Sequence, residues 1–227
     1  MKTLIGTMLH VTDESLCEKL AEYTVLEHYK KDDTILRIGE QQTHIRFLVD
    51  GAVRFFYLDE LETEHTQCFV NEPGYPVMVD AYAAPIYSGC HAIKDTTVLA
   101  LPAEAGYGLM ATSPELMAFY NYVLRKSMFF HAEIAMVLRA GDAQRRYRWF
   151  LSAFPGLEQD AKSRHIASFL CITPETLSRV RAKGVEQEQF HGQMRLPKDE
   201  RSFNEIRENI NEDSWEETLK EHDLLYQ

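Results

Sequence analysis

"SRHIASFLCITPETLSRVRAK" (residues 163–183) predicts two short helices joined by a tight turn. Thr173 is a good N-cap for the second helix, because its hydroxyl can accept a hydrogen bond from a free N–H of the first helical turn. Pro174 suits the first helical position, where its missing N–H costs nothing. Leu177 and Val180 are three residues apart and give the second helix a narrow apolar stripe, with polar residues on the other side.

Two helices joined by so short a turn are typical of a helix-turn-helix, whose second helix can enter a DNA major groove. The alternative is an ordinary helical hairpin with a solvated face. The charge distribution favours the first interpretation. The chain carries a net charge of −11, but residues 141–184 hold eight Lys/Arg against four Asp/Glu. The helix pair therefore lies in the one basic region, and Lys and Arg supply most non-specific affinity for DNA by neutralising phosphates.

Residues 33–102 predict an all-β region, because short runs rich in β-branched and aromatic residues alternate with turn residues. The runs are DTILRIGE (33–40), IRFLVDGAVRFFYLD (45–59), ETEHTQCFV (62–70) and DTTVLALP (95–102). Asp50-Gly51 within the second run indicates a β-hairpin. Several short strands at this spacing are typical of a sandwich or jelly roll. Residues 12–28 predict a short helical lead-in, with Leu16, Leu20 and Val25 on one side.

Residues 114–140 predict one long helix, opened by a Ser113 cap and Pro114. Its apolar residues cover so wide an arc that the helix needs two partners. One partner is the β region of the same chain. We expect the other to be the same helix of a second subunit in a C₂ dimer, although burial in a larger monomeric core is the alternative. The residues predicted at this dimer contact are Leu116, Tyr120, Val123, Phe130, Ile134 and Val137.

The order of these parts resembles the Crp/Fnr family of bacterial transcription regulators over roughly residues 15–183. FLVDGAVRFFY (47–57) and HAIKDTTVLAL (91–101) are similar to the family's cyclic-nucleotide-binding-type jelly roll. AQRRYRWFLSAFP (143–155), followed by IASFLCITPETLSRVR (166–181), is the most specific match. The resemblance implies an α+β chain with an N-terminal jelly-roll sensor domain at 1–112, a dimerisation helix at 113–140 and a helix-turn-helix domain with an acidic extension at 141–227.

The resemblance also implies a homodimer on a two-fold double-stranded DNA operator, with half-sites about 34 Å apart. RNA polymerase is a further partner that it implies. By residue matching, Pro174, Glu175 and Arg179 read base edges, since Arg can donate twice to guanine and Glu can accept from cytosine. The residues expected at phosphates are Thr173, Thr176, Ser178, Arg181 and Lys183. Cys171 departs from the family's turn glycine, so the turn is either wider or held by a cysteine at positive φ.

The effector site also departs from the family. Members that bind cyclic AMP present a Gly-Glu pair for the ribose and an Arg-Ser or Arg-Thr pair for the phosphate, where this chain has Val77-Met78 and Tyr87-Ser88. Without the arginine a buried cyclic phosphate lacks its charge partner. The sequence therefore argues against cyclic AMP and predicts no cofactor. The cavity either holds a small apolar or aromatic ligand or is filled by its own side chains. The candidate lining residues are Phe55, Tyr57, Phe69, Met78, Tyr82, Tyr87 and Ser88.

Composition sets the remaining expectations. No apolar run approaches the roughly 20 residues of a membrane span, and the N-terminus lacks the pattern of a signal peptide, so we expect a cytoplasmic location and no membrane partner. The four cysteines are scattered, and the histidines form no HxH arrangement, so we expect no metal. No nucleophile–base pair or carboxylate pair is evident, so we expect no enzyme. The alternative function is a ligand-sensing or protein-interaction module on the same fold that has lost DNA binding.

Residues 185–227 are the least family-like part, with five Lys/Arg against twelve Asp/Glu. Their pattern predicts one or two acidic helices. Such a tail beside the recognition helix should repel DNA or compete with it for arginines. A disordered or merely stabilising extension is the alternative.

Overall fold

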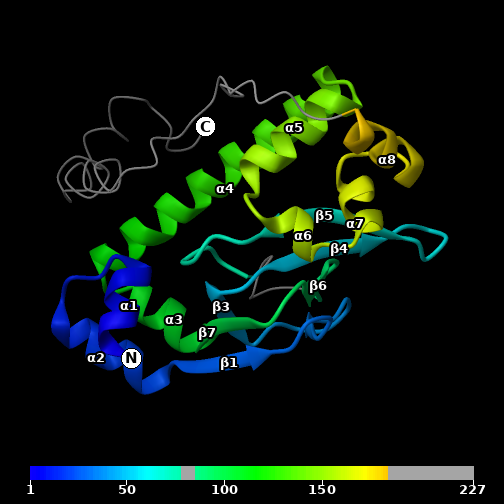
Figure 1. Ribbon diagram of the computed structural model, residues 1–227. Coiled ribbons are helices and arrows are strands. Elements are labelled where there is room, and N and C mark those ends of the chain that lie inside the picture. The colour runs from blue at the N-terminus through cyan, green and yellow to red at the C-terminus, as the bar shows by residue number, and fades with distance from the viewer. Residues whose placement is uncertain (78–84, 184–227) are drawn as a thin grey trace, which may run out of the picture.

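The structure is a computed structural model that describes residues 1–77 and 85–183 (Figure 1). Two helices precede seven strands, and the described chain ends in a series of helices. The helices are α1 (Lys2–Leu9), α2 (Glu14–Tyr23), α3 (Ala103–Met110), α4 (Pro114–Ala140), α5 (Ala143–Ala153), α6 (Leu157–Asp160), α7 (Ser163–Phe169) and α8 (Pro174–Ala182). The strands are β1 (Val25–Tyr29), β2 (Thr34–Leu36), β3 (His44–Asp50), β4 (Val53–Leu58), β5 (Glu64–Val70), β6 (Gly89–Ala92) and β7 (Thr96–Pro102).

The strands form two antiparallel sheets, in the orders β1-β7-β3 and β2-β6-β4-β5. Buried side chains from both sheets share one apolar core, among them Leu48 and Val98 of the first sheet and Val53 and Phe55 of the second. This β sandwich, with helices at both ends of the chain, confirms the expected α+β class and jelly roll.

The hairpin predicted at Asp50-Gly51 is wrong. β3 pairs with β7, whereas β4 pairs with β5 and β6, so the turn carries the chain from one sheet to the other. Gly51 has φ +105°, and a Cβ there would lie 2.5 Å from Thr96 Oγ1. A glycine is therefore required both for the backbone conformation and for the close approach to Thr96.

The helical lead-in predicted over residues 12–28 is partly wrong. α2 begins after Asp13, whose side chain accepts hydrogen bonds from two backbone N–H groups of the first turn. It ends at Tyr23, and Val25 already pairs with Ala100 in the sheet. The unpredicted α1 packs Ile5 and Leu9 into a second core under the first sheet.

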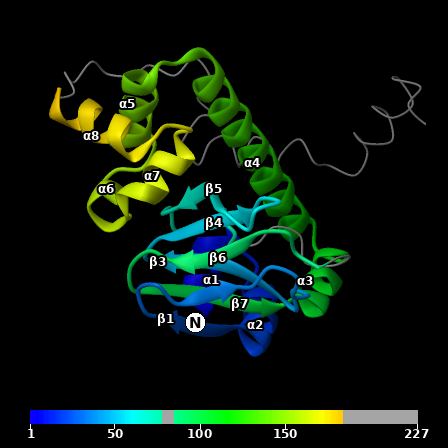
Figure 2. The same ribbon diagram turned by 90° about the vertical axis from the view of Figure 1, so that its right-hand side faces the viewer.

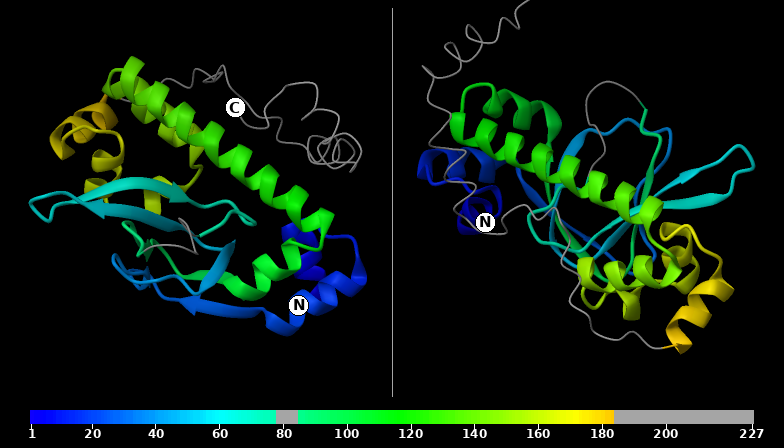
Figure 3. Two further views of the ribbon diagram at one scale, coloured as in Figure 1. Left: turned by 180° about the vertical axis from the view of Figure 1, so that it is seen from behind. Right: turned by 90° about the horizontal axis from the view of Figure 1, so that it is seen from above.

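The long helix lies where the sequence predicts it. Ser113 Oγ accepts a hydrogen bond from the Leu116 N–H at 3.3 Å, and Pro114 occupies the first turn. α4 runs from beside α1–α2, along the β sandwich, to α5 (Figures 1 and 3). It therefore connects the two ends of the molecule.

The helices α5–α8 lie over β4 and β5, at the far end of α4 (Figure 2). α6 begins directly after Gly156 and lies between α5 and α7 in the chain. Phe150, Phe154 and Phe169 contact Phe69 of β5, with ring centroids 5.2–5.9 Å apart. We call these four residues the junction cluster. It joins the core of the small helical domain to the core of the sandwich.

Candidate nucleic-acid interface and internal cavity

α7 and α8 form the predicted helix-turn-helix. α7 ends at Phe169, and the turn passes through Cys171, which has φ +53°. Of the two explanations for the missing glycine, the cysteine at positive φ is the observed one. Thr173 Oγ1 then accepts a hydrogen bond from the Thr176 N–H at 3.2 Å, and Pro174 opens α8.

Packing fixes which face of α8 points outward. Leu177 is fully buried and Val180 nearly so, both in the core built by Phe150, Ile166 and Leu170. The opposite face is solvent-exposed. It carries the predicted residues Thr173, Pro174, Glu175, Ser178, Arg179 and Lys183, while Thr176 is half-buried. This is the arrangement that a recognition helix requires.

Glu175 and Arg179 remain available to an external partner. The Arg179 guanidinium donates to Thr176 Oγ1 at 3.0 Å, and not to the carboxylate four residues earlier. Hydrogen bonds from its own backbone N–H and from Thr173 hold the pKa of Glu175 below its ordinary value. Both side chains are therefore charged at neutral pH, one a donor and the other an acceptor.

Arg181 does not lie where the sequence predicts. Its Nε donates to Glu158 Oε1 at 2.8 Å and one terminal nitrogen donates to Ser163 Oγ at 2.7 Å. Its guanidinium also lies 5.9 Å from the Tyr147 ring, and the Tyr147 hydroxyl donates to the same Glu158 carboxylate. Arg181 thus ties α8 to α5, α6 and α7, and its assignment to a DNA phosphate is corrected to a role within the domain.

Arg146 is a structural residue that the sequence did not reveal. Its Nε donates to the Gly141 carbonyl at 2.8 Å, and one terminal nitrogen donates to the carbonyls of Leu170 and Cys171 at 3.0 and 3.3 Å. Carbonyls at a helix end lack partners inside the helix. Arg146 donates the missing hydrogen bonds to these carbonyls. It thereby holds the turn of the helix-turn-helix against the start of α5.

The predicted dimer residues divide between two environments. Leu116, Ile134 and Val137 are buried in the chain's own cores, and Phe130 and Val123 are partly buried against them. Packing against the sandwich and α5 therefore uses part of the stripe assigned to a partner. The assignment of Leu116, Ile134 and Val137 is corrected, whereas that of Val123 and Phe130 stays a prediction. Only Tyr120 of the predicted set is exposed. The exposed apolar residues of α4 form an outward row, of which Tyr120 and Leu124 also reach the cavity described below: Met117, Tyr120, Leu124, Met128 and Met136.

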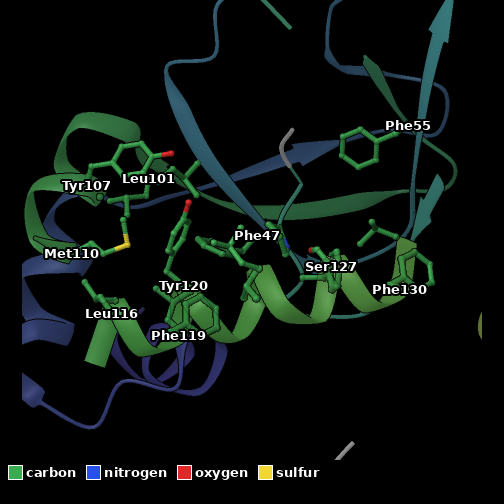
Figure 4. Close-up of a pocket in the computed structure, with 18 of the residues that line it drawn as sticks. Phe47, Phe55, Leu101, Tyr107, Met110, Leu116, Phe119, Tyr120, Ser127 and Phe130 are labelled. Atoms are coloured by element: carbon green, nitrogen blue, oxygen red, sulfur yellow. Dashed lines mark hydrogen bonds between the residues drawn. The ribbon is translucent and has the colours of Figure 1, made fainter. Parts of the chain in front are cut away.

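A cavity of about 430 Å³ lies between α4, α3 and the sheets. Side chains from all three line it, including Phe47, Leu101, Tyr107, Tyr120 and Phe130 (Figure 4). The contribution of α3 was not predicted, because that helix has no strong periodic pattern. The resemblance to the jelly roll predicted a cavity, but not that α4 would form one of its walls.

The predicted lining residues are only partly brought together. Phe55 and Tyr87 line the cavity. Tyr57 lies on the outer surface, where it stacks on His65, and Phe69 lies in the junction cluster, so both assignments are corrected. Ser88 is fully buried and donates to Gln67 at 2.7 Å, one layer behind the lining. Met78 and Tyr82 lie outside the described residues, as does the acidic tail.

Two polar groups of the cavity have pKa values shifted toward their neutral forms. The Tyr75 hydroxyl lies 2.8 Å from Ser127 Oγ of α4, and burial raises the pKa of Tyr75 to about 12. Burial also lowers the pKa of His131. Among the described residues that line the cavity, none is Lys, Arg, Asp or Glu. Such a lining suits an apolar or phenolic molecule better than a phosphate.

Within residues 1–77 and 85–183, no three His, Cys, Asp or Glu side chains gather closely enough to hold a metal ion. Across the same ranges, no helix combines the length and the apolar character that crossing a membrane requires.

No protein-family model and no curated protein matches this chain. Solved structures do. FixK2 from Bradyrhizobium japonicum is 21% identical, with a TM-score of 0.58 over 81% of this chain and 96% of that one. A Eubacterium rectale protein assigned to the Crp/Fnr family of transcriptional regulators is 17% identical, with a TM-score of 0.62 over 86% and 95%. The c-di-GMP-responsive global regulator CLP from Xanthomonas campestris is 14% identical, with a TM-score of 0.60 over 75% and 91%. The chain has the fold of Crp/Fnr-type regulators.

Proposed function

We propose that this chain is a homodimeric, sequence-specific DNA-binding transcription regulator of the Crp/Fnr type, with no enzymatic activity of its own. The observation that carries the proposal is the outward face of α8. Leu177 and Val180 are buried, which leaves Glu175, Ser178 and Arg179 exposed on one surface. An arginine, a carboxylate and a hydroxyl on one short helix are the groups that read base edges in a major groove.

The second subunit packs on the outward row of α4. Met117, Leu124 and Met128 are separated by seven and four residues, which is the spacing of a coiled-coil seam. Met128 is 63% exposed in the single chain. A methionine so exposed beside exposed leucine and tyrosine side chains needs an apolar partner. The parallel partner helix supplies one, and pairing places two copies of α8 on the same side of the dimer.

The cavity takes an effector other than cyclic AMP. Its described lining lacks a cation that could pair with a cyclic phosphate, and Ser88 already donates to Gln67. A small apolar or phenolic molecule matches the lining, with Tyr75 and Ser127 as its hydrogen-bonding groups. Cyclic AMP titrated calorimetrically into the protein should release no heat, and a dissociation constant in the low micromolar range would contradict this.

DNA binding is tested by a mobility-shift titration against salt, with the DNA upstream of the protein's own coding sequence and a shuffled fragment of equal composition. We expect a specific shift whose affinity falls steeply with salt. Arg179→Ala should lose roughly 10- to 100-fold of the preference for the specific fragment. Arg37→Ala, an exposed arginine of the sandwich, is the matched control. Equal affinity of the unmodified protein for both fragments would favour a module that has lost DNA recognition.

A further inference from the structure

A second cavity, of about 190 Å³, lies where the β sandwich meets α6 and α7. This volume has room for about six water molecules at roughly 30 Å³ each. Both domains line it. The sandwich contributes Lys31, Asp32, Arg54, Glu64 and His91, and the helical domain contributes Asp160, Lys162, Arg164 and His165. Below we call this space the junction cavity.

The carboxylates of the junction cavity are already paired. Glu64 accepts from Arg54 at 2.5 Å, and Asp32 accepts from Lys162 at 2.7 Å. The third carboxylate, Asp160, lies 3.6 Å from Lys94 at the edge of the site. Every negative charge that lines the cavity therefore has a cation assigned to it.

Two cations remain without a carboxylate. Lys31 Nζ reaches only the Asp160 backbone carbonyl, at 3.5 Å. Arg164 donates its Nε–H to Nε2 of the neighbouring His165 at 3.0 Å, an unusual use of a guanidinium. The two terminal nitrogens of Arg164 are the fork that binds phosphate or carboxylate oxygens best.

The two histidines of the junction cavity have lowered pKa values, chiefly because they are buried. Burial, and then the charges of Arg54 and Arg164, hold the pKa of His165 at about 4. Burial and Arg54 also lower the pKa of His91. Both imidazoles are therefore neutral near pH 7, although an anion between them would favour their protonated forms.

We infer that the junction cavity binds a small phosphate-bearing anion, which bridges Lys31 of the sandwich and Arg164 of α7. Arginine forks and lysine ammonium groups converging from two domains are the arrangement that binds such groups. The volume admits a pyrophosphate-sized group. The site is distinct from the apolar cavity beside α4, and its occupation does not depend on DNA binding.

A bridging anion would act on the placement of α8. α7 and α8 belong to one core, and α7 meets the sandwich at the junction cavity. An anion held by both domains would stabilise this relative position, because it can contact both domains only while they lie as the structure shows them. The bound anion would then influence the position of α8 in each subunit through the domain junction rather than through α4.

The test is calorimetric titration of the full chain with sodium phosphate, sodium pyrophosphate and ATP at constant ionic strength. We expect pyrophosphate or ATP to bind in the micromolar to low millimolar range. Stronger binding of ATP would assign a nucleotide-borne phosphate, and stronger binding of pyrophosphate would assign an inorganic one. Arg164→Gln and, independently, Lys31→Gln should each weaken binding at least tenfold. Arg37→Gln, an exposed arginine elsewhere on the sandwich, should not.

A spectroscopic measurement separates this site from surface binding. Nuclear magnetic resonance titration of the histidine rings should show the pKa of His165 rising by about 1 pH unit or more when pyrophosphate is bound. No heat with any of the three anions would overturn the inference. Equal weakening by Arg164→Gln and Arg37→Gln, or an unchanged His165 pKa in the presence of saturating anion, would also overturn it.

Discussion

The Ser168 hydroxyl of α7 accepts a hydrogen bond from the backbone N–H of Thr66 at 2.9 Å. Thr66 belongs to β5, the edge strand of the four-stranded sheet. The first helix of the helix-turn-helix therefore covers a sheet edge, which would otherwise present unpaired backbone groups. Together with the junction cluster, this contact fixes where α7, and with it α8, lies relative to the sandwich.

Phe69→Ala should destabilise the whole chain. The Phe69 ring is 1% exposed and contacts three aromatic rings of the helical domain. Removal of a fully buried phenylalanine ring costs about 3–5 kcal/mol. Urea unfolding monitored by tryptophan fluorescence measures the loss. Tyr57→Ala removes an exposed ring from the same sandwich, and we expect it to change the free energy of unfolding by less than about 1 kcal/mol.

Arg179 and Arg181 form a matched pair of the same residue type on one helix. Arg179→Ala should lower DNA specificity and leave thermal stability unchanged, because its side chain contacts only Thr176. Arg181→Ala should lower the free energy of unfolding by about 1–3 kcal/mol, since it leaves the half-buried Glu158 without its charged donor. Mobility shifts and thermal unfolding of both variants separate the two roles. If instead Arg181→Ala lowered DNA specificity and Arg179→Ala lowered stability, the outward face of α8 would be the one that carries Arg181.

Met128→Asp should convert the proposed dimer to a monomer. A carboxylate in the seam of two parallel helices would have to lose its water without a partner. Sedimentation equilibrium at micromolar concentration measures the change in mass. Leu61→Asp is the control, because Leu61 is an 85% exposed residue of the β4–β5 turn. A Met128→Asp protein that remains dimeric would place the interface on another surface.

Acid should weaken the domain junction through His165. Its pKa is about 4 in the folded chain and close to 6.5 when unfolded. The unfolded chain therefore binds a proton first as the pH falls. The stability contributed by this residue is complete above pH 6.5 and is lost as the pH falls from 6.5 to 4, by about 1–2 kcal/mol because solvent screens the half-exposed imidazole. The charged groups facing it are Arg54, Arg164, Lys162 and Glu64.

The measurement is urea unfolding in chloride buffers from pH 7 to 4. His165→Gln should flatten the pH dependence in this range, whereas His28→Gln, on an exposed edge of β1, should retain it. An unchanged slope in His165→Gln would assign the acid sensitivity to other groups.

Cys171→Gly should stabilise the chain. Cys171 is exposed and has φ +53°, a conformation that costs a side-chain-bearing residue roughly 1 kcal/mol relative to glycine. We expect a rise in Tm of a few degrees. Ser178→Gly, in the exposed interior of α8, should lower stability by about 0.5–1 kcal/mol instead. A lower Tm for Cys171→Gly would show that the thiol makes a compensating contact.

Local features such as helix caps could be predicted from the sequence, whereas long-range packing and strand pairing could be predicted less well. Thr173, Pro174 and Ser113 act through neighbouring backbone groups, so their roles could be read from the chain directly. The two arginines of α8 have similar surroundings in sequence, and only the placement of Glu158 and Ser163 engages Arg181. The wide apolar arc of α4 does not show by its pattern which residues face the sandwich. Only packing against the sandwich decides which of them stay exposed. Asp50-Gly51 predicts a tight turn but not whether the strands that it joins share a sheet.

The junction cluster has a consequence for how the molecule comes apart. Because Phe69 belongs to the same apolar core as the helices that carry α8, neither half can lose its packing while the other keeps it. Heating should give one calorimetric transition, with equal van't Hoff and calorimetric enthalpies per cooperative unit, rather than a separate early melting of the helical end. The β sandwich and the helical domain of this chain would then unfold together as one cooperative unit.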